Sequence, residues 1–264
     1  MSYEEHIRAH YKVQAEQSGL SKQSTMHDEF IRDSEVRFIT GELRRGLARW
    51  GAKPEVIEFG CGNGYLLSVL EAEFPEIHFH GLEYTPELLA LAQSRGLRRT
   101  TLRQGDCREQ NFPEKSFHAA ITERVLINLM DREDQLMAAR RIAATLQCGG
   151  LFIMVECFTE PQENLNAARA ELLLPPIPPA HHNFYLDEEF CAKLTELGLV
   201  EVEGHLPSNF LSTHYFNARV LHELLRPEGG AIRNTHFVKF FDAVAPPAVG
   251  NYSSILFRVF EKTA

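Results

Sequence analysis

Apolar positions in the first fifty residues follow a helical spacing. Residues 3–17 and 25–50 are each predicted to form a helix, with a break at the polar sequence SGLSKQS. In the second of them, Val36, Ile39 and Leu43 recur at intervals of three and four residues, as on one face of an amphipathic helix. Two helices are therefore expected before the first strand.

From residue 55 onward, short apolar runs alternate with helical stretches. The predicted strands of this section are 55–59, 77–83, 100–106, 116–122 and 151–156. The predicted helices between them are 65–74, 86–96 and 132–146, the second with Pro86 in its first turn and Gly96 at its end. Strands that alternate with helices in this way are typical of a parallel sheet covered by helices on both faces.

The regular alternation stops after residue 156. Two irregular insertions follow, with one helix expected in each, near 162–173 and at 212–225. Two further strands, at 199–206 and 253–262, bring the predicted number to seven. We therefore expect an α/β fold with a doubly wound, mostly parallel seven-stranded sheet, N-terminal helices and C-terminal cap insertions. The expected divisions are an N-terminal helical lid (1–50), a core (51–156), a first cap insertion (157–186), a core helix and strand (187–206), a second cap insertion (207–250) and a last core strand (251–264).

Charge and composition narrow the class of protein. The formal net charge is −9 and 44% of the residues are hydrophobic, so we expect a globular protein without a basic face for nucleic acid. No signal peptide and no apolar run of about 20 residues is visible, so no membrane association and a cytoplasmic location are expected. The five cysteines include no Cys-x-x-Cys pair, which fits reduced thiols. Whether the chain forms a homodimer is left open.

The sequence EVIEFGCGNGY joins the first predicted strand to a turn with three glycines. Gly60, Gly62 and Gly64 allow the backbone to turn tightly and to approach a ligand without a Cβ in the way. Ligands of open parallel sheets bind at the carboxyl ends of the strands, where the strand order changes direction. The turn is therefore the expected ligand site, and the carboxylate of Glu58 stands directly before it.

Two further acids end neighbouring strands. Glu83 ends the second strand, where a carboxylate can accept from both hydroxyls of a ribose, and Asp106 ends the third in QGDC, where it can accept from the exocyclic amine of adenine. The glycine spacing G-x-G-x-G is one residue tighter than the G-x-G-x-x-G of dinucleotide-binding folds. Together these features favour a nucleoside-containing cofactor other than a nicotinamide dinucleotide.

These segments resemble the Rossmann-like, class I methyltransferases that use S-adenosylmethionine, in particular the members that act on small molecules. EFGCGNG resembles their first motif, LEYTPELLALA the acidic motif of the second strand, and GDCREQNFPEKSFHAAITERVLINL the region of the third and fourth strands. The resemblance implies S-adenosylmethionine as cofactor, with Glu58 near its ammonium group and helix N–H groups near its carboxylate. The residues expected to contact it are Tyr11, Met26, Glu58, Gly60, Cys61, Gly62, Gly64, Glu83, Tyr84, Asp106, Cys107, Thr122, Glu123 and Arg124.

Within that set, two groups have specific expected places. Tyr11 and Met26 belong to a segment that resembles the lid of small-molecule members, where an aromatic face can cover the sulfonium. Thr122, Glu123 and Arg124 follow the fourth strand and are expected to form the floor near the reactive methyl. This segment lacks the Asn/Asp-Pro-Pro-aromatic sequence of enzymes that methylate nucleobase amines, which counts against a nucleic-acid substrate.

A general base is expected to come from the cap insertions, because they cover the pocket. His214 and His182 are the first choices, with Tyr215 beside them, since histidine titrates nearest to neutral pH. His181 and His236 are weaker alternatives, and each of these histidines can instead be a packed, hydrogen-bonded core group. No histidine pair at i, i+4 with a nearby acid occurs in the right context, so no metal is predicted.

The sequence therefore predicts an S-adenosylmethionine-dependent methyltransferase that acts on an oxygen of a small molecule. The segments STHYFNARVLHELL and RVLINL resemble methyltransferases of bacterial surface-sugar and natural-product pathways, which favours a polar acceptor with a hydroxyl group. The many aromatic residues of the insertions suggest a partly apolar acceptor pocket or the cap's own core. Three alternatives remain: N-methylation of a small molecule, a non-catalytic S-adenosylmethionine-binding regulator, and a nicotinamide-dependent oxidoreductase.

Overall fold

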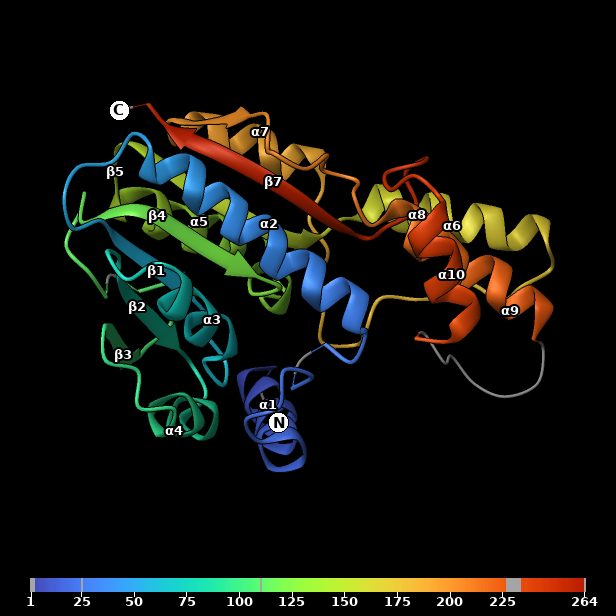
Figure 1. The fold of residues 1–264 in the computed structure, drawn as a ribbon, viewed down its shortest axis with the longest axis horizontal. Helices are drawn as coiled ribbons and strands as arrows, with labels where there is room; N and C mark the ends of the chain where they lie inside the picture. Colours follow the sequence, from blue (N-terminus) through green and yellow to red (C-terminus); the bar gives the residue numbers. More distant parts are fainter. Residues whose placement is uncertain (1–2, 25, 110, 227–233, 264) are drawn as a thin grey trace.

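A seven-stranded sheet with the order β3-β2-β1-β4-β5-β7-β6 forms the centre of the computed structural model (Figure 1). The structure describes residues 3–24, 26–109, 111–226 and 234–263. The strands are β1 (Glu55–Phe59), β2 (His78–Glu83), β3 (Thr100–Gln104), β4 (Phe117–Glu123), β5 (Leu146–Cys157), β6 (Leu199–Val202) and β7 (Ile255–Lys262). The first five run parallel, and β7 is antiparallel to both β5 and β6. The predicted fold class is confirmed.

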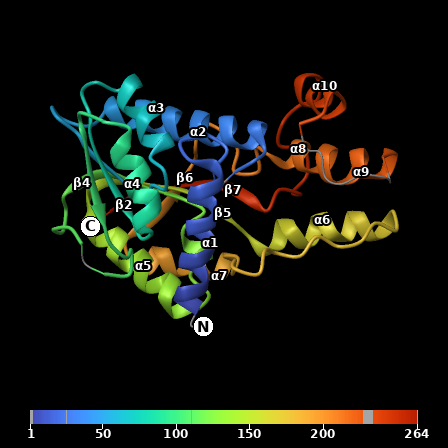
Figure 2. The same cartoon turned by 90° about the horizontal axis from the view of Figure 1, so that it is seen from below.

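Helices cover both faces of this sheet. They are α1 (Tyr3–Ser18), α2 (Glu29–Leu47), α3 (Tyr65–Glu73), α4 (Pro86–Ser94), α5 (Arg132–Thr145), α6 (Thr159–Glu171), α7 (Glu188–Glu196), α8 (Ser212–Phe216), α9 (His222–Leu225) and α10 (His236–Val244), with a short 3-10 turn η1 (Leu126–Asn128) and a π-helical segment η2 (Asn217–Leu221). Figure 2 shows α2 and α3 on one face and α5 and α7 on the other, with α1 crossing the edge between them. The cap elements α6, α8, α9 and α10 project together from one end of the sheet (Figures 1 and 2).

Burial explains why these segments form strands and helices. The central strands are apolar along almost their whole length, and Ile57, Ile121 and Ile153 on three adjacent strands have no exposed surface. Continuous apolar runs are expected for parallel strands that helices cover on both faces. On α2, Phe38 and Leu43 are likewise fully buried. The helical spacing of the sequence thus corresponds to the face that α2 packs on the sheet.

Strands β3 and β6 end earlier than predicted, at Gln104 and Val202, and two other elements differ more strongly from the sequence prediction. Strand β5 begins at Leu146 rather than 151, because Leu146 pairs with Phe117 before a bulge and pairing resumes at Ala119 and Leu151. Gly149, with φ of +77°, lies in this bulge and does not end a helix. The second cap insertion also contains α10, for which the Thr235 hydroxyl accepts from the Val238 amide as the N-cap. Part of that insertion, 227–233, lies outside the described residues.

None of the helices among the described residues is both long enough and apolar enough to cross a membrane.

Candidate active site

A cavity of about 350 Å³ lies at the carboxyl ends of the central strands, and volumes of roughly 300–1,000 Å³ are usual for small-ligand sites. The strand order reverses between β1 and β4 at this edge, which is where open α/β sheets bind ligands. Among the predicted cofactor residues, those that line the cavity are Tyr11, Glu58, Gly60, Cys61, Gly62, Glu83, Tyr84, Asp106, Cys107, Glu123 and Arg124. Met26, Gly64 and Thr122 do not line it.

The three glycines of the turn serve different purposes. Each has a positive φ, of 70° at Gly60, 53° at Gly62 and 72° at Gly64. A Cβ on Gly60 would lie 2.4 Å from the side chain of Val125, and one on Gly64 would lie 3.0 Å from Ala92. A Cβ on Gly62 would meet no atom within 4 Å. Gly60 and Gly64 are therefore required for packing, whereas Gly62 leaves room on the cavity side.

Glu83 is attached to the glycine turn. Its Oε2 accepts from the Gly62 amide at 2.8 Å and its Oε1 from the Thr85 amide at 2.8 Å. Burial raises the pKa of this carboxyl, although the backbone N–H groups oppose the shift. Since each carboxylate oxygen has two lone pairs, both retain the capacity to accept from a ligand hydroxyl.

Glu58 is buried without complete pairing. Only 3% of the residue is exposed, and its Oε2 has no hydrogen-bond partner among the described residues. Burial, and then the negative charge of Glu123, raise the pKa of Glu58 well above its ordinary value. A buried carboxylate in this position would be stabilised by a cation in the cavity.

A buried group of charges lies next to Glu58. Arg124 binds Glu123 at 2.7 Å and also Glu35, while Arg32 contacts Glu123 and lies 3.8 Å from Glu35. Burial raises the pKa of Glu35 to about 8. Burial also acts to raise the pKa of Glu123, but the positive charges of Arg32 and Arg124 outweigh it and hold the pKa of Glu123 below its ordinary value. With Glu58, three carboxyl groups face two guanidinium groups. The sequence analysis did not identify Arg32 and Glu35, whose only sequence signal is their i, i+3 spacing within an amphipathic helix.

Asp106 is paired more fully than the sequence suggests. Its Oδ1 accepts from the backbone N–H of Arg108 at 2.8 Å, and its Oδ2 lies 2.6 Å from the guanidinium of the same residue. That guanidinium also binds Asp134 at 2.7 Å and Glu4 at 2.8 Å. Burial opposes ionisation, but the hydrogen bonds from Arg108 hold the pKa of Asp106 below its ordinary value. An adenine amine would have to share this carboxylate with Arg108.

Residues that follow β2 and β4 hold helix α1 over the cavity. The Asn128 side chain donates to the hydroxyl of Tyr11 at 2.8 Å, and burial raises the pKa of that hydroxyl to about 12. The guanidinium of Arg8 lies 4.5 Å from the centre of the Tyr84 ring. These contacts hold the aromatic ring of Tyr11 in the cavity wall.

The connection after α1 is fixed to the glycine turn. The side-chain amide of Asn63 donates to the carbonyl oxygens of Gly19 at 2.8 Å and Ser21 at 3.0 Å. Arg95 donates to the Leu20 carbonyl at 2.8 Å and to the Asn63 carbonyl at 2.6 Å. Neither Asn63 nor Arg95 was identified as a site residue from the sequence, because these contacts join segments far apart in the chain.

The segment after β4 is held by a buried acid at the end of β5. Glu156 has no exposed surface, and its Oε1 accepts from the amides of Val125 at 2.9 Å and Leu126 at 3.1 Å. Burial raises the pKa of Glu156 to about 7. These bonds fix the turn that carries Arg124, whose φ is +56°. Thr122, the first residue predicted for this floor, is fully buried in β4 instead.

The structure separates the predicted base residues. His182 lines the cavity, and its ring centre lies 4.1 Å from that of His10, a further lining residue that the sequence analysis did not select. His214 and Tyr215 do not line it. His214 lies in the cap, with Nδ1 2.8 Å from Asp242 and Nε2 2.9 Å from Asp28. The arrangement around His214 is that of a buried ion cluster, so its geometry does not support a role as base.

Tyr215 and the weaker histidine alternatives are also placed away from the cavity. Tyr215 is 5% exposed and lies beneath the guanidinium of Arg219, 3.7 Å from the centre of its ring. His181 contacts the ring of His182 at 4.9 Å without lining the cavity, and His236 is exposed at the first turn of α10.

The fold and the site together define a class of protein. The features of a class I methyltransferase are all present: parallel strands whose order reverses between β1 and β4, an antiparallel β7 between β5 and β6, and an acid-lined cavity at the glycine turn. Residues 56–150 match the model of a family described as a methyltransferase domain. The chain therefore contains a methyltransferase domain within the fold of the class I methyltransferases, and S-adenosylmethionine is its cofactor.

Solved structures share this fold at low sequence identity. A Haloferax volcanii protein described as a methyltransferase, in complex with the Trm112 methyltransferase activator, is 16% identical, with 90% of this chain and 96% of that chain covered at a TM-score of 0.56. A Galdieria sulphuraria protein described as a sarcosine dimethylglycine methyltransferase is 14% identical, with coverage of 88% and 86% and a TM-score of 0.56. The [4+2]-cyclase SpnF is 15% identical, with coverage of 85% and 78% and a TM-score of 0.53. No protein of curated function matches the sequence.

Proposed function

We propose that the protein transfers the methyl group of S-adenosylmethionine to an oxygen of a small polar molecule, a hydroxyl, phosphate or carboxylate of a sugar or natural-product intermediate. The observation that carries the proposal is the position of His182, in the wall of the same cavity as Glu58, Gly62 and Glu83. The cavity of about 350 Å³ has the size that is usual for small-ligand sites. The acidic charge of the chain also favours a small molecule over nucleic acid.

The side chains of the cavity fit the cofactor. S-adenosylmethionine supplies a methyl group that its sulfonium activates, and it brings a cationic ammonium group as well. The Oε2 of Glu58 has no hydrogen-bond partner in the described part of the chain, and carboxyl groups outnumber guanidinium groups around it; both features suit that cation. Gly62 leaves room for the ligand, and Glu83 can accept from ribose hydroxyls at the neighbouring strand end.

The protein contributes alignment and, for a hydroxyl acceptor, a base. Holding two reactants in a near-attack geometry can lower the barrier by about 7–11 kcal/mol. A positioned base typically adds a factor of roughly 10²–10⁴ in rate. His182 is the proposed base, because it lines the cavity whereas the other two predicted catalytic residues, His214 and Tyr215, do not. A phosphate or carboxylate acceptor needs no base, and His182 would then position the acceptor instead.

Transfer of isotope from labelled S-adenosylmethionine tests the proposal. The full chain is incubated with panels of hydroxyl-, phosphate-, carboxylate- and amine-bearing small molecules, and labelled products are separated by chromatography. We expect label in an oxygen-bearing acceptor, with a rate roughly 10²–10⁴-fold lower for His182→Ala if the acceptor is a hydroxyl. The matched control is His181→Ala, which alters the adjacent histidine outside the cavity wall.

Other outcomes identify the alternatives. Label in amines alone would replace O-methylation by N-methylation. Binding of S-adenosylhomocysteine without transfer to any acceptor class would favour a regulatory binder, and the fold shared with the cyclase SpnF shows that the scaffold also hosts a different reaction. Absence of S-adenosylhomocysteine binding would remove the basis of the proposal.

A further inference from the structure

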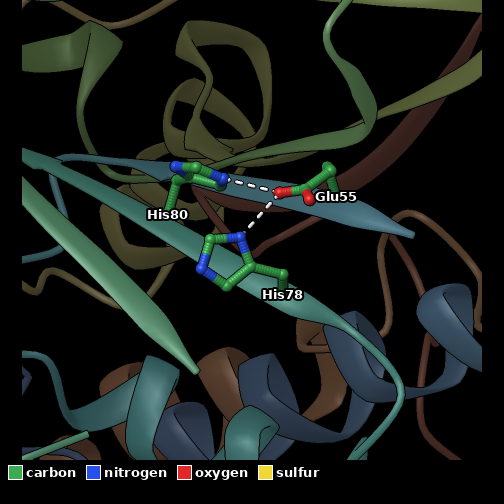
Figure 3. A group of neighbouring side chains, drawn as sticks. All are labelled: Glu55, His78 and His80. Atoms are coloured by element: carbon green, nitrogen blue, oxygen red, sulfur yellow. Dashed lines mark hydrogen bonds and ion pairs between the residues drawn. The ribbon is translucent and has the colours of Figure 1, made fainter. Parts of the chain in front are cut away.

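Three potential metal ligands meet at the opposite edge of the sheet from the cofactor cavity. Glu55 is the first residue of β1, and it pairs in register with His78, the first residue of β2. His80 follows two residues later, so its side chain lies on the same face of the strand as that of His78. Figure 3 shows the three side chains pointing toward one another from the two strands.

The donor atoms of these side chains converge. The Nδ1 of His78 lies 2.8 Å from Oε2 of Glu55, and the Nε2 of His80 lies 2.7 Å from the same oxygen. All three donor atoms lie within 4.8 Å of one another. In a tetrahedral zinc site, metal–ligand bonds of about 2.0–2.2 Å separate the donors by roughly 3.3 Å. The two contacts between the histidines and Glu55 would therefore have to lengthen by about half an ångström to admit an ion.

We propose that Glu55, His78 and His80 bind a divalent transition-metal ion of the zinc class. Two imidazole nitrogens and one carboxylate oxygen form a donor set suited to such ions rather than to Mg²⁺ or Ca²⁺, which prefer oxygen ligands. The side chains of Glu55, His78 and His80 are 37%, 40% and 18% exposed. Solvent can therefore reach the site and complete the coordination.

The surroundings of both histidines orient their rings for this role. The Nε2 of His78, which faces away from the site, lies 3.2 Å from the hydroxyl of Thr101 on β3. The ring of His80 packs edge-on against Phe117, with centres 5.0 Å apart. Metal-binding histidines commonly have a hydrogen-bond partner on the second ring nitrogen, which fixes the ring and its tautomer. Thr101 is such a partner for His78, whereas Nδ1 of His80 has no hydrogen-bond partner among the described residues and packing alone orients that ring.

The sequence prediction of no metal did not consider this arrangement. It rested on histidine pairs at the helical i, i+4 spacing with an acid nearby in the chain. Here the pair is at i, i+2 on a strand, and the acid lies 23 residues before His78. Only the pairing of β1 with β2 brings the three residues together.

Direct binding to the chelator-treated full chain tests the proposal. Calorimetry with Zn²⁺ and the visible absorption of bound Co²⁺ should both report one equivalent of ion. His78→Gln and Glu55→Gln should each weaken the Zn²⁺ affinity by at least about 10–100-fold, the range seen even for partners of metal ligands. Two controls should leave it unchanged: His236→Gln, which alters an exposed histidine on α10, and Cys148→Ser, which removes the exposed thiol.

Three results would overturn the proposal: no uptake of either ion, equal affinity in the ligand variants, or loss of binding in Cys148→Ser. A thermal readout keeps the test independent of methyl transfer. An ion that joins β1 to β2 should raise the unfolding midpoint of the wild-type chain when Zn²⁺ is added, and His78→Gln should show no such rise. Because His78 is partly exposed, this variant is expected to fold.

Discussion

The backbone N–H of Gly62 donates to Oε2 of Glu83 at 2.8 Å, and this bond joins the glycine turn after β1 to the end of β2. The two motifs are 21 residues apart in the chain, and in the structure they form one side of the cavity. The acid therefore supports the turn and also lines the cavity. A change at either residue should affect cofactor binding, and the two effects can be separated.

Glu83→Gln should weaken the binding of S-adenosylhomocysteine. The amide keeps the size of the side chain but loses the charge and one acceptor, and hydrogen bonds to a charged group contribute about 1.5–3 kcal/mol. Calorimetric titration should therefore show a dissociation constant raised by roughly 10–150-fold. Glu76→Gln, at an exposed glutamate before β2, is the control. Unchanged affinity in Glu83→Gln would remove this residue from the site.

Gly62→Ala should abolish or strongly weaken cofactor binding while the protein still folds. Its Cβ would enter open space beside the cavity, and its φ of +53° would cost about 1–2 kcal/mol of stability for a residue with a side chain. Gly96→Ala is a matched control, since Gly96 has φ of +65° and a Cβ there would also meet no atom within 4 Å, but Gly96 does not line the cavity. The two variants should lose similar free energies of unfolding. Equal S-adenosylhomocysteine affinities would contradict the placement of Gly62.

Glu58→Gln should stabilise the free protein and weaken its cofactor binding. Burial raises the pKa of Glu58, so the folded state retains a proton that the unfolded state has lost, and stability falls as pH rises above the ordinary value near 4.5. The variant should remove this loss, which we expect to be about 1–3 kcal/mol for a buried polar group without a partner. Denaturant unfolding between acidic and neutral pH, with and without S-adenosylhomocysteine, measures both effects.

The comparison between wild type and Glu58→Gln has a clear sign. The stability advantage of the variant should grow with pH in the free protein and disappear or reverse when the ligand is bound. A constant difference at every pH would show that Glu58 ionises in the folded protein as it does in the unfolded chain.

His214→Gln should reduce stability and leave the activity of the folded enzyme nearly unchanged. Burial acts to lower the pKa of His214, but hydrogen bonds with Asp242 and Asp28 outweigh burial, so the pKa is raised overall. The stabilisation that protonated His214 gives to the folded protein is therefore fully present below pH 6.5, near the pKa of histidine in the unfolded chain. It is lost as the pH rises through the higher pKa of His214 in the folded protein. Removing one partner of a buried ion cluster costs about 3–5 kcal/mol, and unfolding should show this loss at mildly acidic pH and a smaller one at alkaline pH.

Rates per folded molecule distinguish this structural role from catalysis. His236→Gln, at an exposed histidine of α10, controls for the substitution itself. If the fully folded His214→Gln variant transferred methyl groups much more slowly than the wild type, His214 would again be a candidate base.

The sequence by itself determined the sheet and the side of it that binds the cofactor. The alternation of apolar strands with amphipathic helices predicts parallel strands, and parallel strands place their carboxyl ends at one edge. The glycine turn and Glu83, each at the end of a predicted strand, therefore had to lie near each other. The exceptions, the start of β5 and helix α10, lie where a bulge and an insertion replace the regular spacing.

Only the tertiary structure decided which distant segments complete the site. Arg32 reaches Glu123 from α2, and His182 rather than His214 lines the cavity. The packing of α2 and of the two insertions on the sheet sets these contacts. Local spacing carries no information about such packing. In the same way, Glu55 meets His80 through the register of β1 against β2, which is fixed by burial of the opposite faces of both strands.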